Sequence, residues 1–235
     1  FHEYGSNHDD LVNISVKNHM HGFENEFADI RKEVSFEKAA SGFMVADPLT
    51  LYDCCPTSDG ASCVILAADH VVREFTDDPI WLKGSGAGSD HLALHDRHSI
   101  TQMSATQKAV AQAYKSSGVA ARDIDLAEVH DCFTIAELMA TEDLGFANRG
   151  EGGLFARQGR GRRNEGDVAI NPSGGLKSKG HPLGATGTGQ AVEIFKQLKG
   201  TVEAPRQIRD AEIGLTHNVG GSGATCAVHI FGRDR

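Results

Sequence analysis

The chain has 235 residues, of which 40% are hydrophobic and 23% charged, a balance typical of a globular protein and not of a disordered one. Lys and Arg number 23 against 32 Asp and Glu, so the net charge is −9; with no basic stripe either, a nucleic-acid partner is not expected. No apolar run approaches the roughly 18 to 20 residues that span a bilayer, so no membrane partner is expected. The first ten residues show no export signal, and we expect a cytoplasmic location.

The cysteine and glycine content of the chain indicates which kinds of functional site to expect. The five cysteines are odd in number and match no zinc ribbon or finger, so neither a metal site nor a disulfide scaffold is predicted. Glycine is frequent, at 27 residues, and much of it lies between 145 and 223. Glycine gathered in particular segments indicates tight turns and close approach of the backbone to a ligand.

The first part of the chain predicts one helix and one strand. Residues 7–22 read as a helix whose first residue, an Asn, is the N-cap, with aspartates in the first turn. We interpret His19 and His21 of this helix as structural or solvated, because no third donor lies nearby at metal-ligand spacing. Residues 23–50 are expected to be irregular, and residues 61–66 to form a strand followed by a short helical turn.

The second part alternates strands and helices. Asp-Asp-Pro at 77–79 marks a break, which places the main boundary at about residue 79, before a short strand at 80–83 and a glycine-rich loop. Residues 104–117 form the clearest predicted helix, with Ser104 as N-cap and Gly118 as its end. Later predicted elements are a strand ending at His130, helices at 134–144 and 187–200, and strands at 212–216 and 224–231. This order is typical of a layered α/β fold.

Three turn segments carry candidate catalytic side chains: His130 with Cys132, His181, and residues 217–221. Each is weak alone, because a single histidine or cysteine at a strand end is more often structural. A thiol beside two imidazoles can act as a tuned acid or base. Two imidazole N–H groups that converge can also stabilise the oxyanion of a thioester. Together the segments favour acyl transfer between thiols.

The same segments resemble one family. NPSGGLKSKGHPLGATG (171–187) closely resembles the thiolase signature in which N-x-x-G-G precedes G-H-P-x-G-A-T/S-G. HDCF (130–133) looks like the motif of the sterol-carrier-protein-type thiolases, and HNVGGSGA (217–224) resembles the C-terminal motif of that subfamily. The resemblance covers about residues 10–233. It implies a thiolase-like layered α-β-α-β-α fold, represented here by its C-terminal half and the end of its N-terminal half.

The resemblance also implies roles. His181 would take the proton of the nucleophilic cysteine, and Cys132 would be the second acid/base thiol, acting on the α-carbon of the acetyl unit. His130 would join His181 in the oxyanion hole for the enolate. The Gly220 amide would contribute to the second hole, with Asn218 supporting that turn. Coenzyme A thioesters would be substrates, with no bound cofactor. The weaker candidates for holding the phosphates of coenzyme A are Arg157, Arg160, Arg162 and Arg163.

One departure from the family concerns the nucleophile. In thiolases the acyl-accepting cysteine lies before the segments seen here, and we interpret Cys54, Cys55 and Cys63 as structural. Residues 1–78 would then be the end of the N-terminal domain with part of the loop region, and residues 79–235 the C-terminal domain. We therefore expect an N-terminal half carrying the nucleophile as an obligate partner, in a homo- or hetero-oligomer, and no activity from the chain alone.

The leading interpretation is thus a thiolase-type acyl-CoA acyltransferase that makes or cleaves 3-oxoacyl-CoA. One alternative is a thiolase-like retro-aldolase, which the retention of Cys132 disfavours. Another is a catalytically silent subunit that binds coenzyme A or acts as a scaffold. The missing nucleophile favours the scaffold, and the joint presence of His130, Cys132 and His181 disfavours it.

Overall fold

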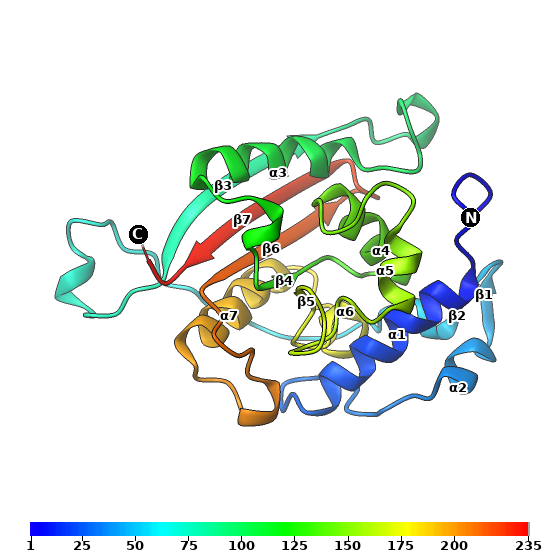
Figure 1. Cartoon of the computed structure of the whole chain (residues 1–235), viewed down its shortest axis with the longest axis horizontal. Helices are drawn as coiled ribbons and strands as arrows, with labels where there is room; N and C mark the ends of the chain where they lie inside the picture. The colour runs from blue at the N-terminus through cyan, green and yellow to red at the C-terminus, as the bar shows by residue number, and fades with distance from the viewer. Residues whose placement is uncertain (235) are drawn as a thin grey trace.

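A five-stranded mixed sheet organises the computed structural model, which describes residues 1–234 (Figure 1). The strand order is β3-β7-β6-β4-β5. β4 is parallel to both of its neighbours, and β7 is antiparallel to both of its own. The strands are β3 (Trp81–Ser89), β4 (Leu126–Glu128), β5 (Ala169–Ile170), β6 (Ile213–Gly220) and β7 (Thr225–Gly232).

Helices cover both faces of this sheet. α3 (Ser104–Ser117) lies along β3 and β7, and α7 (Thr186–Lys199) packs on the opposite face against β4 and β6. Two apolar clusters fill the interfaces. Val110, Leu215 and Val228 belong to the α3 side, and Leu126 and Ile194 to the α7 side. The predicted α/β class is confirmed. The sheet and the helices on its two faces form three layers, α-β-α, of the predicted α-β-α-β-α arrangement.

The N-terminal helix α1 (His8–Phe23) lies beside α4, α5 and α6. Asn7 caps it as predicted: its side chain accepts the Asp9 N–H at 2.9 Å, and the Asp10 carboxylate accepts the Asn7 N–H at 2.9 Å. His19 and His21 are buried, so these histidines are not solvated. The remaining elements are α2 (Phe36–Ala40), β1 (Met44–Ala46), β2 (Leu49–Thr50), α4 (Thr134–Asp143), α5 (Gly152–Arg157), α6 (Gly175–Ser178) and five short 3-10 turns.

The segment predicted to be a glycine-rich loop after residue 83 is part of strand β3, so that expectation is wrong. Gly84, Gly86 and Gly88 alternate along β3 and face α3. A Cβ on any of the three would overlap a backbone carbonyl oxygen of α3. The glycines are therefore there to let a helix lie unusually close to the sheet, and not to form a turn.

Other expectations fare unevenly. Helix 104–117 is confirmed, but Met103 and not Ser104 is its N-cap residue. Residues 61–66 form no strand and join no β-ladder among residues 1–234. The hairpin of β1 and β2 and the helices α2 and α5 were not predicted, because each is too short to show a periodic pattern. The boundary at residue 79 stays a prediction.

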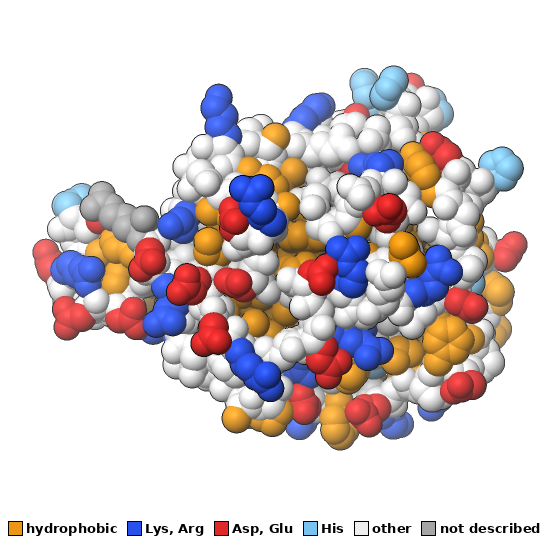
Figure 2. All heavy atoms as spheres, viewed as in Figure 1, with side chains coloured by type: hydrophobic (Ala, Val, Ile, Leu, Met, Phe, Trp, Pro, Cys, Tyr) orange, Lys and Arg blue, Asp and Glu red, His pale blue; other side chains and the backbone are white. Residues whose placement is uncertain are grey.

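Large apolar side chains are exposed at several places, and two of these are groups of neighbouring residues. One is the unpaired segment at 61–68, where Ile65 is 91% and Leu66 75% exposed. The other lies over α2, β1 and β2, where Figure 2 shows hydrophobic side chains gathered on the right of the view. The exposed residues there are Phe36, Phe43, Met44, Val45 and Leu51. Within residues 1–234, no helix has the length and apolar character needed to cross a membrane.

Candidate active site

The three predicted motif segments meet at the end of the sheet where strands β4, β5 and β6 terminate. β4, β5 and β6 are mutually aligned, so the segments that follow or end them lie together at their carboxyl ends. A cavity of about 650 Å³ opens between them. Its lining includes all five residues predicted to do the chemistry: His130, Cys132, His181, Asn218 and Gly220.

The two predicted catalytic histidines are in contact. The rings of His130 and His181 are edge to face, with centroids 5.0 Å apart and planes at 89°. Burial, and then the charge on His181, lowers the pKa of His130 to about 4. Burial, and then the Lys179 charge, also lowers the pKa of His181. Both imidazoles are therefore neutral near pH 7, and each offers one N–H donor and one lone pair.

The tautomer of His181 is assigned from the hydrogen bonds of Thr186. The Thr186 hydroxyl lies 3.1 Å from the Pro182 carbonyl oxygen, which can only accept, so the hydroxyl donates there. Its oxygen lies 2.7 Å from Nδ1 of His181, and we assign Nδ1 as the donor of this hydrogen bond. The lone pair is left on Nε2. His181 is therefore held in the tautomer that can act as a base at Nε2.

A third imidazole supports the site without lining the cavity. The His130 backbone N–H lies 3.4 Å from Nδ1 of His217, which accepts, so Nε2 of His217 donates to the Thr106 hydroxyl at 3.0 Å. Burial lowers the pKa of His217 to about 3. Gln190 of α7 donates to the His217 carbonyl at 3.2 Å and accepts from the Asn218 amide at 3.1 Å. These bonds fix the end of β6.

Cys132 is held as a thiol. Burial, and then the Asp131 charge, raises its pKa to about 11, so it carries its proton at neutral pH and can act as an acid. Its carbonyl accepts the Cys55 N–H at 3.0 Å, so the Cys54–Cys55 segment lies against the catalytic loop. Burial also raises the pKa of Cys54 and of Cys55, while Cys63 is exposed.

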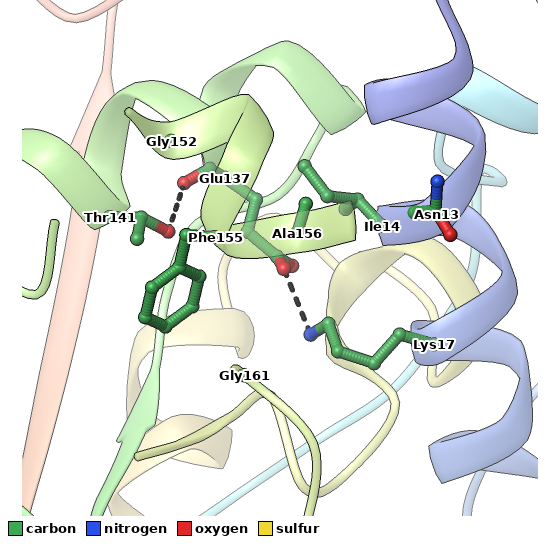
Figure 3. Close-up of a pocket in the computed structure, with 9 residues that line it drawn as sticks. All are labelled: Asn13, Ile14, Lys17, Glu137, Thr141, Gly152, Phe155, Ala156 and Gly161. Carbon is green, nitrogen blue, oxygen red and sulfur yellow. Dashed lines mark hydrogen bonds and ion pairs between the residues drawn. The ribbon is translucent and has the colours of Figure 1, made fainter. Parts of the chain in front are cut away.

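A buried polar network lies beneath the catalytic loop. Asp131 accepts the Leu176 N–H at 2.7 Å, the first of several donors, and the Asn18 amide at 2.8 Å. The same Asn18 amide reaches Glu137 at 2.7 Å. Glu137 also forms an ion pair with Lys17 at 2.8 Å, drawn in Figure 3 beside a hollow of only about 10 Å³. The hollow is too small for a ligand, so the network is structural.

The arginines proposed to hold the phosphates of coenzyme A lie elsewhere. None of them lines the cavity around His130, and each faces a carboxylate. The pairs are Arg157 with Asp10 at 2.8 Å, Arg160 with Asp167 at 2.6 Å, Arg162 with Glu165 at 3.8 Å and Arg163 with Glu24 at 2.6 Å. Their role toward coenzyme A stays a prediction, and the structure does not bring them to the catalytic residues.

Sequence reasoning missed three residues that complete the site. Thr186 is hydrogen-bonded to Nδ1 of His181, Gln190 joins α7 to the end of β6, and Arg97 lines the cavity. Thr186 stands five residues after His181, a spacing that places it at the start of the following helix. Arg97 lies in the segment between β3 and α3 and had no local signal. No cluster of three or more metal-ligating side chains occurs in residues 1–234.

Comparison with known proteins identifies the family. Residues 86–233 match the thiolase C-terminal domain-like family. The chain belongs to the thiolase family. It is 49% identical over 232 residues to an acetyl-CoA acetyltransferase of Methanothermobacter thermautotrophicus, covering 99% of this chain and 60% of that relative. It is 37% identical over 227 residues to sterol carrier protein 2 of Oryctolagus cuniculus, covering 94% of this chain and 41% of that relative.

Comparison with solved structures supports the same family. The structure of the Ltp2-ChsH2(DUF35) aldolase superposes with a TM-score of 0.87 at 25% identity, covering 100% of this chain and 60% of that one. The thiolase-like fold expected from the motifs is confirmed. The chain spans about 60% of the length of the acetyl-CoA acetyltransferase that it matches.

Proposed function

We propose that this thiolase-family chain supplies the acid/base and oxyanion-binding groups of an acyl-CoA acyltransferase that cleaves or forms 3-oxoacyl-CoA. The observation that carries the proposal is that His181, assigned as the base, and Cys132, assigned as the acid, line one cavity. His181 presents a lone pair at Nε2, and Cys132 keeps its proton. A nucleophilic cysteine from an N-terminal half would complete the set.

In the thiolytic direction, these groups would act in the following order. Nε2 of His181 accepts the proton of the nucleophilic thiol, whose sulfur attacks the 3-keto carbon of the substrate. The bond between C2 and C3 breaks, and its electron pair passes to the thioester oxygen of the departing acetyl unit as an enolate. Nε2–H of His181 and an N–H of His130 donate to that oxygen.

The remaining steps use Cys132 and the turn at the end of β6. The Cys132 thiol gives its proton to the α-carbon of the enolate, which releases acetyl-CoA. A second coenzyme A then gives its thiol proton to the Cys132 thiolate, and its sulfur attacks the acyl-cysteine. The carbonyl oxygen of the acyl group accepts a hydrogen bond from the Gly220 N–H, and the nucleophilic cysteine leaves and recovers its proton from Nε2 of His181. Each preorganised oxyanion donor contributes about 3–4 kcal/mol to the lowering of the barrier. Coenzyme A thioesters are substrates throughout.

The exposed segment 61–68 supports a partner. Its residues are mostly apolar, yet no ladder pairs them in residues 1–234, and Ile65 and Leu66 face solvent. An unpaired apolar segment of this kind is stabilised by forming a strand at the edge of another sheet. We propose that this sheet belongs to the N-terminal half. Native mass spectrometry of the chain mixed with such a half should show a stable complex, and a monodisperse 25.1 kDa monomer in that mixture would contradict it.

The catalytic assignment is tested on that complex. Thr186→Val removes the acceptor that holds Nδ1–H of His181, so the proton can move to Nε2 and block the base. We expect thiolysis to fall at least about tenfold in kcat/KM, and by about 10²–10⁴ in His181→Ala. Thr188→Val, two residues further along α7, should leave kcat/KM unchanged. Equal rates in Thr186→Val and Thr188→Val would contradict the assigned tautomer.

A second candidate is a retro-aldolase, favoured by the structural similarity to the Ltp2-ChsH2(DUF35) aldolase. The two reactions differ in their use of free coenzyme A. A thiolase consumes one coenzyme A thiol for each 3-oxoacyl-CoA cleaved, whereas a retro-aldolase consumes none. Titration of free thiol during turnover of the complex distinguishes them, and absence of both reactions would leave the scaffold role.

A further inference from the structure

The cavity around His130 contains one formally charged side chain. Of its lining residues, only Arg97 is a Lys, Arg, Asp or Glu, since His130 and His181 are neutral near pH 7. Arg97 comes from the segment between β3 and α3. Much of the rest of the wall is apolar: Leu94, Ile100, Phe133, Ile135, Met139 and Leu183. A single cation therefore faces a largely apolar cavity.

The guanidinium is fixed without being neutralised. Its Nε donates to the His91 carbonyl at 2.7 Å and Nη1 to the Ser222 carbonyl at 2.9 Å. Both acceptors are uncharged. Within residues 1–234 no carboxylate oxygen lies within 4.0 Å of this group, and its buried Nη2 has no hydrogen-bond partner. The pKa of Asp90 is lowered first by the His91 N–H, which its carboxylate accepts at 2.8 Å, and also by the charge of Arg97. Asp90 nevertheless forms no ion pair with Arg97.

The position of this cation relates it to the reacting atoms. Ser222, which Nη1 binds, is two residues after Gly220, so the two lie no more than about 7 Å apart along the chain. A short acyl chain could therefore reach from the proposed oxyanion hole to a group bound by Arg97. A cation with a free donor is stabilised most by a charged acceptor, because such hydrogen bonds are roughly twice as strong as neutral ones.

We propose that the cavity takes coenzyme A thioesters whose short acyl chain ends in a carboxylate, and that Arg97 binds that carboxylate. The inference rests on the proposed function, which places the acyl group in this cavity. A phosphate of coenzyme A offers the same anionic chemistry and is the other source to distinguish. A purely structural Arg97 would only join its own segment to the turn at 220–223.

The test compares two ligands of equal chain length, succinyl-CoA and butyryl-CoA, by calorimetric titration of the whole chain. Wild type should bind succinyl-CoA about tenfold or more tightly than butyryl-CoA. Arg97→Gln keeps an amide donor for a carbonyl and loses the charge, and it should abolish the preference. Arg97→Lys should retain part of it. Arg122→Gln removes an exposed arginine outside the cavity and should bind like wild type.

Two outcomes would overturn the proposal. Arg97→Gln could weaken both ligands equally, with the effect lost when 3′-dephospho-CoA thioesters are used; Arg97 would then bind the phosphate of coenzyme A. Or Arg97→Gln could leave both affinities unchanged, which fits a structural role alone. Urea unfolding of each variant shows that the fold is retained. Because binding needs no turnover, a retained preference without any thiolysis would remove the proposed function and leave the anion subsite.

Discussion

The backbone N–H of His130 donates to Nδ1 of His217, so a residue that lines the cavity is held by one that lies wholly behind it. His217→Leu leaves this buried N–H without an acceptor and removes the imidazole donor to the Thr106 hydroxyl. We expect a loss of about 1–3 kcal/mol of folding free energy for the N–H left unpaired, measured by urea unfolding.

His217→Asn is the matched comparison, because its amide oxygen can replace the Nδ1 acceptor. It should lose less stability than His217→Leu and should keep more activity in the complex. Equal losses in the two variants would show that the hydrogen bond to His130 contributes little.

Stability should fall on mild acidification. Burial lowers the pKa of His19 and of His130 to about 4, and that of His217 to about 3, each from an ordinary value of 6.5. Between these values the unfolded chain binds protons that the folded chain does not, so stability rises with pH. The contribution is therefore complete above about pH 6.5 and is lost progressively as pH falls toward 4.

Unfolding free energies measured between pH 8 and pH 5 check this. His217→Asn should flatten the slope, whereas His2→Gln, at an exposed position, should leave it unchanged. A slope identical in wild type and His217→Asn would mean that His217 is not the neutral buried imidazole described.

The close approach of β3 to α3 predicts an intolerant glycine. In Gly86→Ala the new Cβ would overlap the Ala109 carbonyl oxygen on α3, so the helix must move. We expect a loss of about 1–3 kcal/mol, typical of overpacking. Gly184→Ala is the control, since its Cβ would meet nothing within 4 Å. Thermal unfolding of both variants decides whether the site is as tight as described.

Thiol reactivity should separate the five cysteines. Burial raises the pKa of Cys132 and of Cys226 to about 11, whereas Cys63 is exposed. Since the thiolate is the reactive form, iodoacetamide at pH 8 should modify Cys63 first and these two last. Peptide mapping by mass spectrometry gives the order. Rapid loss of the Cys132 thiol would contradict its assignment as a protonated acid.

The sequence predicted the long elements well, because their signals are local. Helix 104–117 carries its apolar face and its terminating Gly118 within one continuous segment. The glycines at 84–88 were misread for the opposite reason. Glycine favours turns locally, and only the position of α3, more than fifteen residues later, explains why a strand here needs residues without a Cβ.

The residues of the candidate site were also predictable only where their signal was local. His130, Cys132 and His181 were found from their motifs, and the structure brings them into one cavity. The arginines at 157–163 were chosen for charge alone, and their carboxylate partners include residues as distant as Asp10 and Glu24. Ion pairing between such remote segments has no signature in a single sequence.

The network beneath the catalytic loop determines how the chain can be recombined with its relatives. α1 supplies Asn18 to Asp131 and Glu137, and Lys17 to Glu137 and the Ile170 carbonyl. A chimera that exchanged only residues 86–233 would bring its own loop carboxylates to an unmatched α1. A crossover placed before residue 8 would instead transfer both sides of the network together, so α1 and the catalytic loop form one unit of exchange.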